Sequence, residues 1–99
     1  MVILKSNYKF IGFEISHLKN KKYNAILKNK ENHKLKKIPF GDKRYEQYED
    51  KTNLQAYKKL NHYDKERRRL YKIRHNYHYK KSIQNKIYSP SYFSMKYLW

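Results

Sequence analysis

Charge limits what this chain can fold into more than any other feature of its sequence. Among its 99 residues, 25 are Lys or Arg and 8 are Asp or Glu, which gives a formal net charge of +17. Self-repulsion of this size destabilises a compact isolated chain, and the same charge attracts nucleic acid, anionic membranes and acidic proteins. Part of it also fits codon bias in an AT-rich genome, but that bias does not explain the shortage of Asp and Glu. We therefore expect a bound counter-charge in the working state.

Several protein classes are excluded by what the chain lacks. Without cysteine it has no disulfide framework, thiol nucleophile or Cys-type zinc site. The longest apolar runs, such as Met1–Leu4 and Phe10–Phe13, are far too short to span a membrane. The first residues also lack the apolar core of a signal peptide. We expect a protein of the cytosol, the nucleus or a particle assembled there.

The first forty residues alternate between apolar and polar side chains, as half-buried strands do. The alternation predicts strands at 8–18, 23–28 and 34–40, separated by polar turns. Because Pro cannot donate to a strand ladder, the third strand should end at Pro39 or lie at a sheet edge. The predicted apolar faces consist of Ile11, Phe13 and Ile15, of Tyr23, Ala25 and Leu27, and of Leu35 and Ile38. This pattern favours an antiparallel β-meander.

Helical signals follow the meander. Asp42 is a good N-cap for a short helix over Lys43–Asp50, and Thr52 can cap a second helical segment with Leu54, Tyr57 and Leu60 at three-residue spacing. The sequence Ser89-Pro90 is typical of the start of a final short helix. With the helix described next, these signals predict three to four short helices.

Residues 63–77 give the clearest helical pattern. Tyr63, Leu70 and Tyr77 form a line of residues seven apart, with Ile73 beside it. The opposite face carries four cations, Lys65, Arg68, Arg69 and Lys72. We therefore predict that the apolar line packs inward and that the basic face is exposed.

We predict an α+β fold, in which a small N-terminal antiparallel β-meander is packed by three to four short helices. The chain is short enough to form a single small basic domain over residues 1–99. Residues 1–40 would form the meander, and residues 41–99 would form the helical part with its aromatic C-terminal tail.

The basic helix is the main candidate for a binding surface. Four of the five arginines, Arg67, Arg68, Arg69 and Arg74, lie within eight residues of one another. An Arg fork matches the geometry of a phosphate group, and no base-reading signature accompanies it. The candidate nucleic-acid-binding residues are Lys65, Arg68, Arg69, Lys72, Lys80 and Lys81 for phosphates and Tyr79 for stacking on a base. The same charges also suit a solvated face or an acidic protein surface, and Tyr79 also suits packing at the helix end.

The C-terminal tail carries five aromatic residues, Tyr88, Tyr92, Phe93, Tyr97 and Trp99. In one interpretation they dock on the open face of the sheet and complete the core. In the other, Tyr92, Phe93, Tyr97 and Trp99 anchor the chain in a partner, because Trp and Tyr dominate interface hot spots.

Histidines give weak support for catalysis. His75 and His78 are three residues apart, with His62 and Asp64 nearby in sequence. A metal site needs three or four converging ligands, and Asp64 suits a helix cap better. We predict no metal, no cofactor and no enzymatic activity, with a small nuclease that uses His62, Asp64 and His75 as the enzymatic alternative.

Three segments, PFGDKRYEQYEDKT (39–52), LNHYDKERRRLYKIRH (60–75) and YSPSYFSMKYLW (88–99), resemble a family of small basic proteins of nucleocytoplasmic large DNA viruses. The shared pattern includes an FGD turn, a His-x-Asp-x-x-Arg-Arg helix start and a terminal Tyr-Leu-Trp, and Asn61 stands where the family has an acidic residue. The resemblance implies a viral setting but no activity. It also implies that His62, Asp64, Arg67, Arg74 and His75 form a buried polar network.

These observations lead to one leading hypothesis and one alternative. The chain would be a non-enzymatic structural protein of a viral particle that binds nucleic acid, most simply packaged DNA, without sequence specificity. It would be found in the virion and in the host cytoplasm (the viral factory) or nucleus. In the alternative, it is a minor capsid or scaffold protein that cements acidic viral proteins through its aromatic C-terminus.

Overall fold

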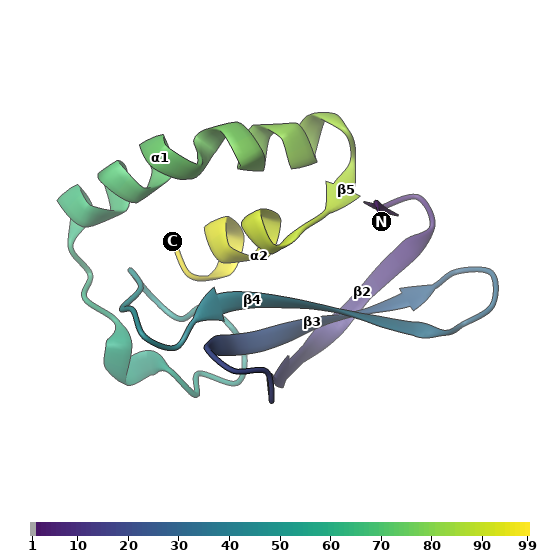
Figure 1. The fold of residues 1–99 in the computed structure, drawn as a ribbon, viewed down its shortest axis with the longest axis horizontal. Helices are drawn as coiled ribbons and strands as arrows, with labels where there is room; N and C mark the ends of the chain where they lie inside the picture. Colours follow the sequence, from purple (N-terminus) through teal and green to yellow (C-terminus); the bar gives the residue numbers. More distant parts are fainter. Residues whose placement is uncertain (1) are drawn as a thin grey trace.

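The computed structural model describes residues 2–99 and has an α+β architecture (Figure 1). A three-stranded antiparallel sheet has the order β2 (Tyr8–Ile15), β3 (Lys21–Asn29) and β4 (Leu35–Asp42). A two-stranded antiparallel sheet joins β1 (Ile3–Leu4) to β5 (Ile87–Tyr88). The helices are α1 (Lys65–Gln84) and α2 (Pro90–Tyr97), and a 3-10 turn, η1, covers Lys58–Leu60. The predicted meander is confirmed, and the predicted number of helices is too high.

The elements form three layers. In Figure 1, α2 lies between α1 above it and the three-stranded sheet below it. The core lies between α2 and the sheet, where Tyr23, Ala25 and Leu27 on the central strand β3 are completely buried. Phe40 from β4 and Phe93 from α2 pack with them, and their ring centroids are 5.6 Å apart. The apolar face predicted for residues 23–28 is therefore confirmed.

A β-bulge changes the predicted face of β2. The pairing register with β3 shifts between Phe10 and Gly12, so one extra residue is inserted there. As a result both Phe10 and Phe13 face the core, with ring centroids 4.9 Å apart. Ile11 and Ile15 are each 48% exposed, so the prediction that they share the buried face with Phe13 is wrong.

β4 continues through its proline as an edge strand. Pro39 lies opposite Asn24 in the ladder, and the strand runs on to Asp42. Its position at the end of the sheet order confirms the edge alternative, because an edge strand tolerates a residue without an N–H. Ile38 and Phe40 are buried, whereas Leu35 is largely exposed near the hairpin turn.

Both helices begin at side-chain caps that the sequence indicates. The Asp64 carboxylate accepts hydrogen bonds from the backbone N–H groups of Glu66 (2.9 Å) and Arg67 (3.1 Å) at the start of α1. The Ser89 hydroxyl accepts from the N–H of Tyr92 (3.1 Å), and Pro90 opens α2. A cap of this kind stabilises a helix by about 1 kcal/mol.

The orientation predicted for α1 is wrong. Its supposed inner line is exposed, with Tyr63 at 59%, Leu70 at 43%, Ile73 at 61% and Tyr77 at 65%. The side turned toward the rest of the fold instead carries partly or fully buried residues, namely Arg68, Tyr71, Lys72, His75, Tyr79 and Ser82. Aromatic rings stack there and long basic side chains bury their aliphatic stems, so the buried face is aromatic and basic rather than aliphatic.

The two helices predicted between β4 and α1 do not form. Residues 43–57 are turns and irregular backbone, and only η1 is helical before α1. The backbone is held instead by buried side chains. Asp50 accepts from the Tyr23 hydroxyl, from the Thr52 hydroxyl (2.6 Å) and from the N–H of Tyr57 (3.2 Å). These bonds outweigh the weak helical propensity of the segment.

Gln47 and Asn61 complete this buried network. The Gln47 amide donates to the carbonyl of Tyr57 (2.8 Å) and to Asn61 Oδ1 (2.7 Å), and the same Asn61 oxygen accepts from the N–H of Asp50 (2.7 Å). Gln47, Asp50 and Thr52 are almost fully buried, so each lost bond would leave a buried polar group without a partner. Within residues 2–99, no helix combines the length and the apolar character that crossing a membrane requires.

Candidate functional site

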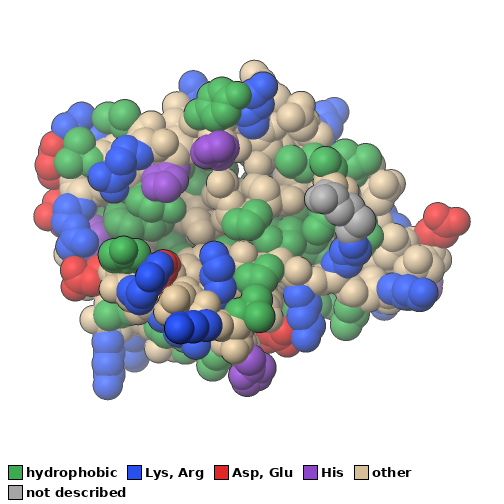
Figure 2. All heavy atoms as spheres, viewed as in Figure 1, with side chains coloured by type: hydrophobic (Ala, Val, Ile, Leu, Met, Phe, Trp, Pro, Cys, Tyr) green, Lys and Arg blue, Asp and Glu red, His purple; other side chains and the backbone are tan. Residues whose placement is uncertain are grey.

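Basic side chains dominate the molecular surface. In Figure 2, Lys and Arg side chains are spread around all sides of one face, with few acidic side chains between them. Four carboxylates pair with a Lys or Arg, in the pairs Glu14–Lys37, Asp42–Arg44, Glu46–Arg67 and Glu66–Arg69. The Asp50 carboxylate accepts from the Tyr23 hydroxyl, and the Asp64 carboxylate caps α1, as described above. Because 25 cations face 8 acidic residues, most cations have no carboxylate to pair with.

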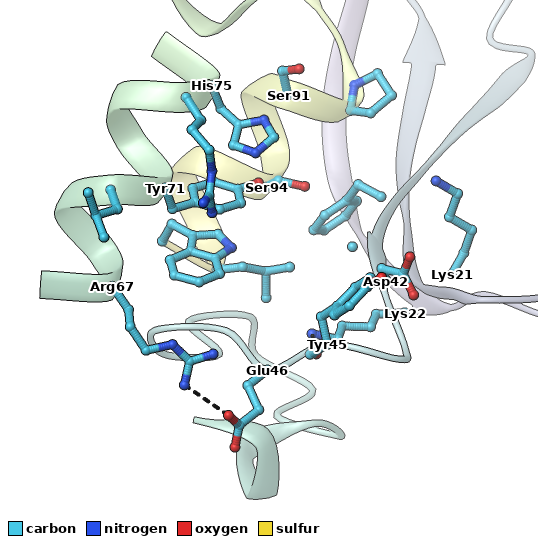
Figure 3. Close-up of a pocket in the computed structure, with 17 residues that line it drawn as sticks. Lys21, Lys22, Asp42, Tyr45, Glu46, Arg67, Tyr71, His75, Ser91 and Ser94 are labelled. Atoms are coloured by element: carbon cyan, nitrogen blue, oxygen red, sulfur yellow. Dashed lines mark hydrogen bonds and ion pairs between the residues drawn. The ribbon is translucent and has the colours of Figure 1, made fainter. Parts of the chain in front are cut away.

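A groove of about 630 Å³ opens on the surface of the molecule. It lies between α1, α2 and the ends of β3 and β4, and the segment after β4 closes one side (Figure 3). Its lining residues are mainly basic, aromatic or hydroxyl-bearing: Lys21, Lys22, Arg67, Arg74, Tyr45, Tyr71, His75, Trp99, Ser91 and Ser94. Asp42 and Glu46 are its acidic residues.

One wall of the groove is a stack of aromatic rings. The ring of Tyr71 is 4.0 Å from that of Trp99, with an interplanar angle of 5°, and 4.1 Å from that of His75, at 27°. Burial raises the pKa of the Tyr71 hydroxyl and lowers the pKa of the His75 imidazole. Both shifts favour the neutral forms, so the wall presents mainly ring surface to the groove.

The acidic groups of the groove are already neutralised. Arg44 donates to both Asp42 oxygens, from Nε (3.0 Å) and Nη2 (2.7 Å), and holds the pKa of that carboxyl down at about 2. Arg67 Nη1 lies 2.9 Å from Glu46 Oε1, as the dashed line in Figure 3 shows. Among the described residues, Arg74 is in no ion pair, and Lys21 acts on Asp42 only at longer range because Arg44 makes the ion pair with that carboxylate. The groove therefore keeps two cations that can meet an anion.

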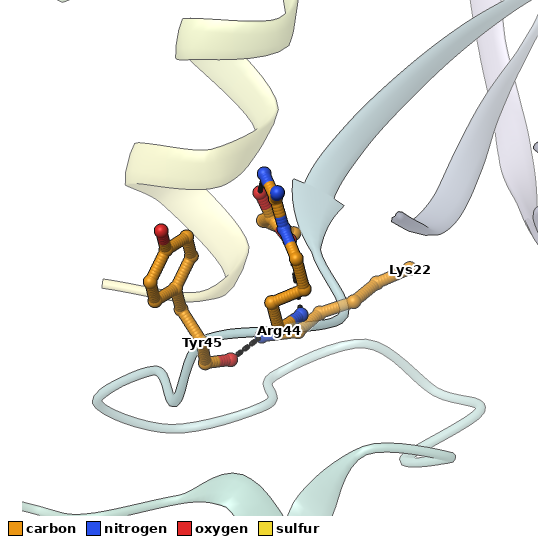
Figure 4. A network of polar contacts seen from close by, with 4 residues as sticks. Lys22, Arg44 and Tyr45 are labelled. Atoms are coloured by element: carbon orange, nitrogen blue, oxygen red, sulfur yellow. Dashed lines mark hydrogen bonds and ion pairs between the residues drawn. The ribbon is translucent and has the colours of Figure 1, made fainter. Parts of the chain in front are cut away.

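Lys22 is a buried cation beside this groove. Only 2% of it is exposed, and its ammonium donates to the carbonyl of Tyr45 (2.9 Å; Figure 4). The ammonium also donates to the side-chain oxygen of Gln47. Both acceptors are neutral, so burial lowers the pKa of Lys22 to about 8, against the attraction of Asp50 and Asp42. Lys22 holds the segment after β4 in place, because its two bonds join β3 to that segment.

The predicted basic face of α1 is partly used by the fold. Lys65, Arg68, Arg69 and Lys72 do lie together, around a shallow depression. However, Arg68 Nε donates to the carbonyl of Trp99 (2.8 Å), its guanidinium lies 4.6 Å from the centre of the Tyr48 ring, and Arg69 pairs with Glu66. Burial and the nearby Arg68 and Lys51 lower the pKa of Lys72. Within residues 2–99, Lys65 is the member of this set that is exposed and is in no ion pair.

The other predicted contact residues lie toward the end of α1. Tyr79 is partly buried, and its ring is stacked 6.4 Å from that of Tyr92, so packing uses the ring proposed for base stacking. Lys80 and Lys81 are exposed, with the Lys81 ammonium 5.5 Å from the centre of the Tyr77 ring. These two lysines remain candidates for phosphate contact.

The four predicted partner anchors lie against the core. Phe93 is fully buried, Tyr92 is 8% exposed, and Tyr97 and Trp99 pack around them. Phe93 contacts Phe10, with ring centroids 5.4 Å apart, and the Tyr97 ring lies 4.7 Å from that of Phe13. The aromatic tail therefore docks on the open face of the sheet, and Phe93 has no exposed surface to offer a partner.

The buried network implied by the family resemblance is not formed by the residues named for it. Asp64 caps α1, Arg67 pairs with Glu46 at the surface, and His75 stacks on Tyr71. His62 Nδ1 accepts from the N–H of Asp64 (2.9 Å), and its buried Nε2 has no hydrogen-bond partner in the part of the chain that the structure describes. Within residues 2–99, no three His, Asp or Glu side chains are placed to hold a metal ion.

Several groove residues carry no signal in the sequence. Lys21, Tyr45 and Ser91 come from three segments that are distant along the chain. Arg67, Arg74, His75 and Trp99, by contrast, belong to basic, histidine or aromatic patterns that stand out before folding. The fold and the groove together define a small α+β protein with a basic surface and an aromatic-walled groove. In comparisons with protein-family models, curated proteins and solved structures, nothing matched this chain.

Proposed function

We propose that this chain binds nucleic acid electrostatically and without sequence specificity, as a non-enzymatic structural protein of a large DNA virus particle. The observation that carries the binding proposal is the surplus of surface cations over carboxylates. The particle setting rests on the family resemblance of three chain segments.

The surplus of surface cations favours a polyanion as the binding partner over a surface with a few isolated acidic groups. Lys and Arg side chains lie on every side of the face in Figure 2, and Glu14, Asp42, Glu46 and Glu66 are already paired with a Lys or Arg. A protein that neutralises several phosphates at once releases condensed counterions, and this gain needs no particular base sequence. Lys65, Lys80 and Lys81 are exposed members of the predicted contact set.

The test is binding to a random-sequence duplex and to a single strand across a salt series. We expect log affinity to fall linearly with log salt, with a slope of about −0.9 for each duplex phosphate neutralised. The double variant Lys80→Glu/Lys81→Glu should weaken binding and make the slope shallower, whereas Lys80→Arg/Lys81→Arg should preserve both. Absence of salt-dependent binding would contradict the proposal and direct attention to an acidic protein partner.

A further inference from the structure

We propose that the groove between α1, α2 and the ends of β3 and β4 accepts an unpaired nucleotide, so that the chain prefers single-stranded nucleic acid to duplex. This inference rests on the proposed function and names the part of the nucleic acid that the groove takes. It concerns a site distinct from the exposed cations of the general surface.

The size of the groove suits one or two nucleotides rather than a double helix. Its volume of about 630 Å³ falls in the range of about 300–1,000 Å³ typical of clefts that bind small molecules. In a duplex the bases are stacked and paired inside the helix, and they enter a protein pocket only after they have been flipped out. A single strand presents its bases without that cost.

The walls of the groove suit a base. On one side stand the stacked rings of Tyr71, Trp99 and His75, and Tyr45 lies on the opposite side in Figure 3. Tyr45 is 64% exposed, whereas the other aromatic side chains that line the groove are partly or fully buried. The guanidinium of Arg44 lies over the Tyr45 ring, 5.5 Å from its centre, and the exposed part of Tyr45 is what a base could stack on. Aromatic rings accept any base, because every base has a π face.

The charges of the groove suit the phosphate of the same nucleotide. Arg74 on α1 and Lys21 on β3 are exposed and line the groove. Among the described residues Arg74 is in no ion pair, and Lys21 attracts Asp42 across the ladder while Arg44 makes the ion pair with that carboxylate. Asp42 and Glu46, the acidic groups present, are held by Arg44 and Arg67. Ser91 also lines the groove, and its hydroxyl can donate to a phosphate oxygen. A base against the rings and a phosphate between the cations would satisfy both halves of the site.

The chain contains a spectroscopic reporter for this site. Trp99 is its single tryptophan and lines the groove, in contact with Tyr71. The first experiment is titration of the full chain with a short oligothymidine and with a duplex of the same length, with selective excitation of tryptophan. We expect the single strand to quench Trp99 and the duplex to bind without this change. An oligouridine run in parallel tells RNA from DNA as the source of the strand, and quenching by either supports the site.

Matched tyrosine variants then separate the groove from the general surface. Tyr45 is 64% exposed and Tyr77 is 65% exposed, but only Tyr45 lines the groove. Loss of one base–aromatic stack lowers affinity by about tenfold. Tyr45→Ala should therefore lower single-strand affinity about tenfold and leave duplex affinity within about twofold. Tyr77→Ala should change neither affinity by more than about twofold. Circular dichroism and the melting temperature check that both variants fold.

A matched arginine pair tests the phosphate half of the site. Arg74→Gln and Arg69→Gln each remove one positive charge, so both weaken duplex binding to a similar extent. Arg74→Gln should in addition lose single-strand affinity and reduce the quenching of Trp99. Equal affinities for strand and duplex, an unchanged Trp99 signal, and indistinguishable effects of Tyr45→Ala and Tyr77→Ala would overturn the groove site while the proposed electrostatic binding stands. Failure of both nucleic acids to bind in a salt-dependent manner would overturn both proposals.

Discussion

Two consecutive side chains of β3 decide how the segment after β4 is held. Lys22 donates to the carbonyl of Tyr45 and to Gln47, and Tyr23 donates to Asp50 while accepting from the N–H of Ala56 (2.9 Å). All these groups lie 23 or more residues away in sequence from the strand residue that they contact. An ammonium with two neutral acceptors is costly to bury, so the charge state of Lys22 should affect stability measurably.

The pH dependence of stability should reveal this buried lysine. Burial lowers the pKa of Lys22 to about 8 in the folded protein, against 10.5 for an ordinary lysine. Between these two pH values the unfolded chain binds more protons than the folded one, so the contribution of Lys22 to stability rises with pH. We expect the free energy of unfolding of the wild type, minus that of Lys22→Met, to increase from pH 8 to pH 10.5 in urea denaturation.

The difference between the two proteins isolates Lys22 from other titrating groups. Tyr23, whose pKa is raised to about 12 by burial and by its bond to Asp50, lowers stability as the pH rises above 10, but it is present in both proteins. Lys21→Met, at the exposed neighbouring lysine, is the matched control for loss of one charge. A difference that stays flat or falls over this pH range would mean that Lys22 is solvated in the folded state.

At the scale of the element, α1 has two faces that could pack inward, one aliphatic and one aromatic and basic, and the second is the one that is buried. The aliphatic line of Leu70 and Ile73 is exposed, while Tyr71 and His75 face Trp99. Ring stacking and buried aliphatic stems of Arg68 and Lys72 make the inner surface. Local hydrophobic periodicity cannot predict this choice, because the Trp99 side chain against which the helix packs comes from the far end of the chain.

Substitutions on the two faces of α1 should therefore have unequal costs. Ile73→Gln should change the free energy of unfolding by less than about 0.5 kcal/mol, as is usual for an exposed position. Tyr71→Ala should cost about 2 kcal/mol or more, because it removes a half-buried ring that stacks on two others. Chemical denaturation measures both values. A larger cost for Ile73→Gln than for Tyr71→Ala would favour the orientation predicted from the sequence.

The same contrast explains how much of the fold could be predicted. The strands and the caps at Asp64 and Ser89 depend on residues within a few positions of one another, so the alternation and the cap residues predicted them. The segment from Lys43 to Tyr57 depends on β3, and the groove combines Lys21, Tyr45, Arg74 and Ser91 from separate elements. Contacts of this kind arise only after the chain has folded, and single-sequence patterns carry no record of them.

For the whole molecule, net charge and size together determine how strongly the cations repel one another at a given salt concentration. The formal net charge is +17, and the radius of gyration is 13.6 Å. The Debye length is about 30 Å at 0.01 M salt and about 8 Å at 0.15 M. At low salt cations therefore repel one another over most of the molecule, which extends 42 × 28 × 21 Å, whereas at physiological salt most pairs are screened. The ion pairs that salt would weaken are exposed, and each contributes little.

Thermal stability should consequently rise with sodium chloride over this range. For a domain of this size, each gain of about 1 kcal/mol raises the melting temperature by about 4–8 °C. Lys80→Glu/Lys81→Glu lowers the formal net charge by four from +17, so its melting temperature should rise less steeply with salt, as measured by circular dichroism. A melting temperature that falls with salt would mean that attractive pairs outweigh the repulsion. In that case repulsion between the surplus cations would not destabilise the free protein, and a bound polyanion would not be needed to stabilise the fold.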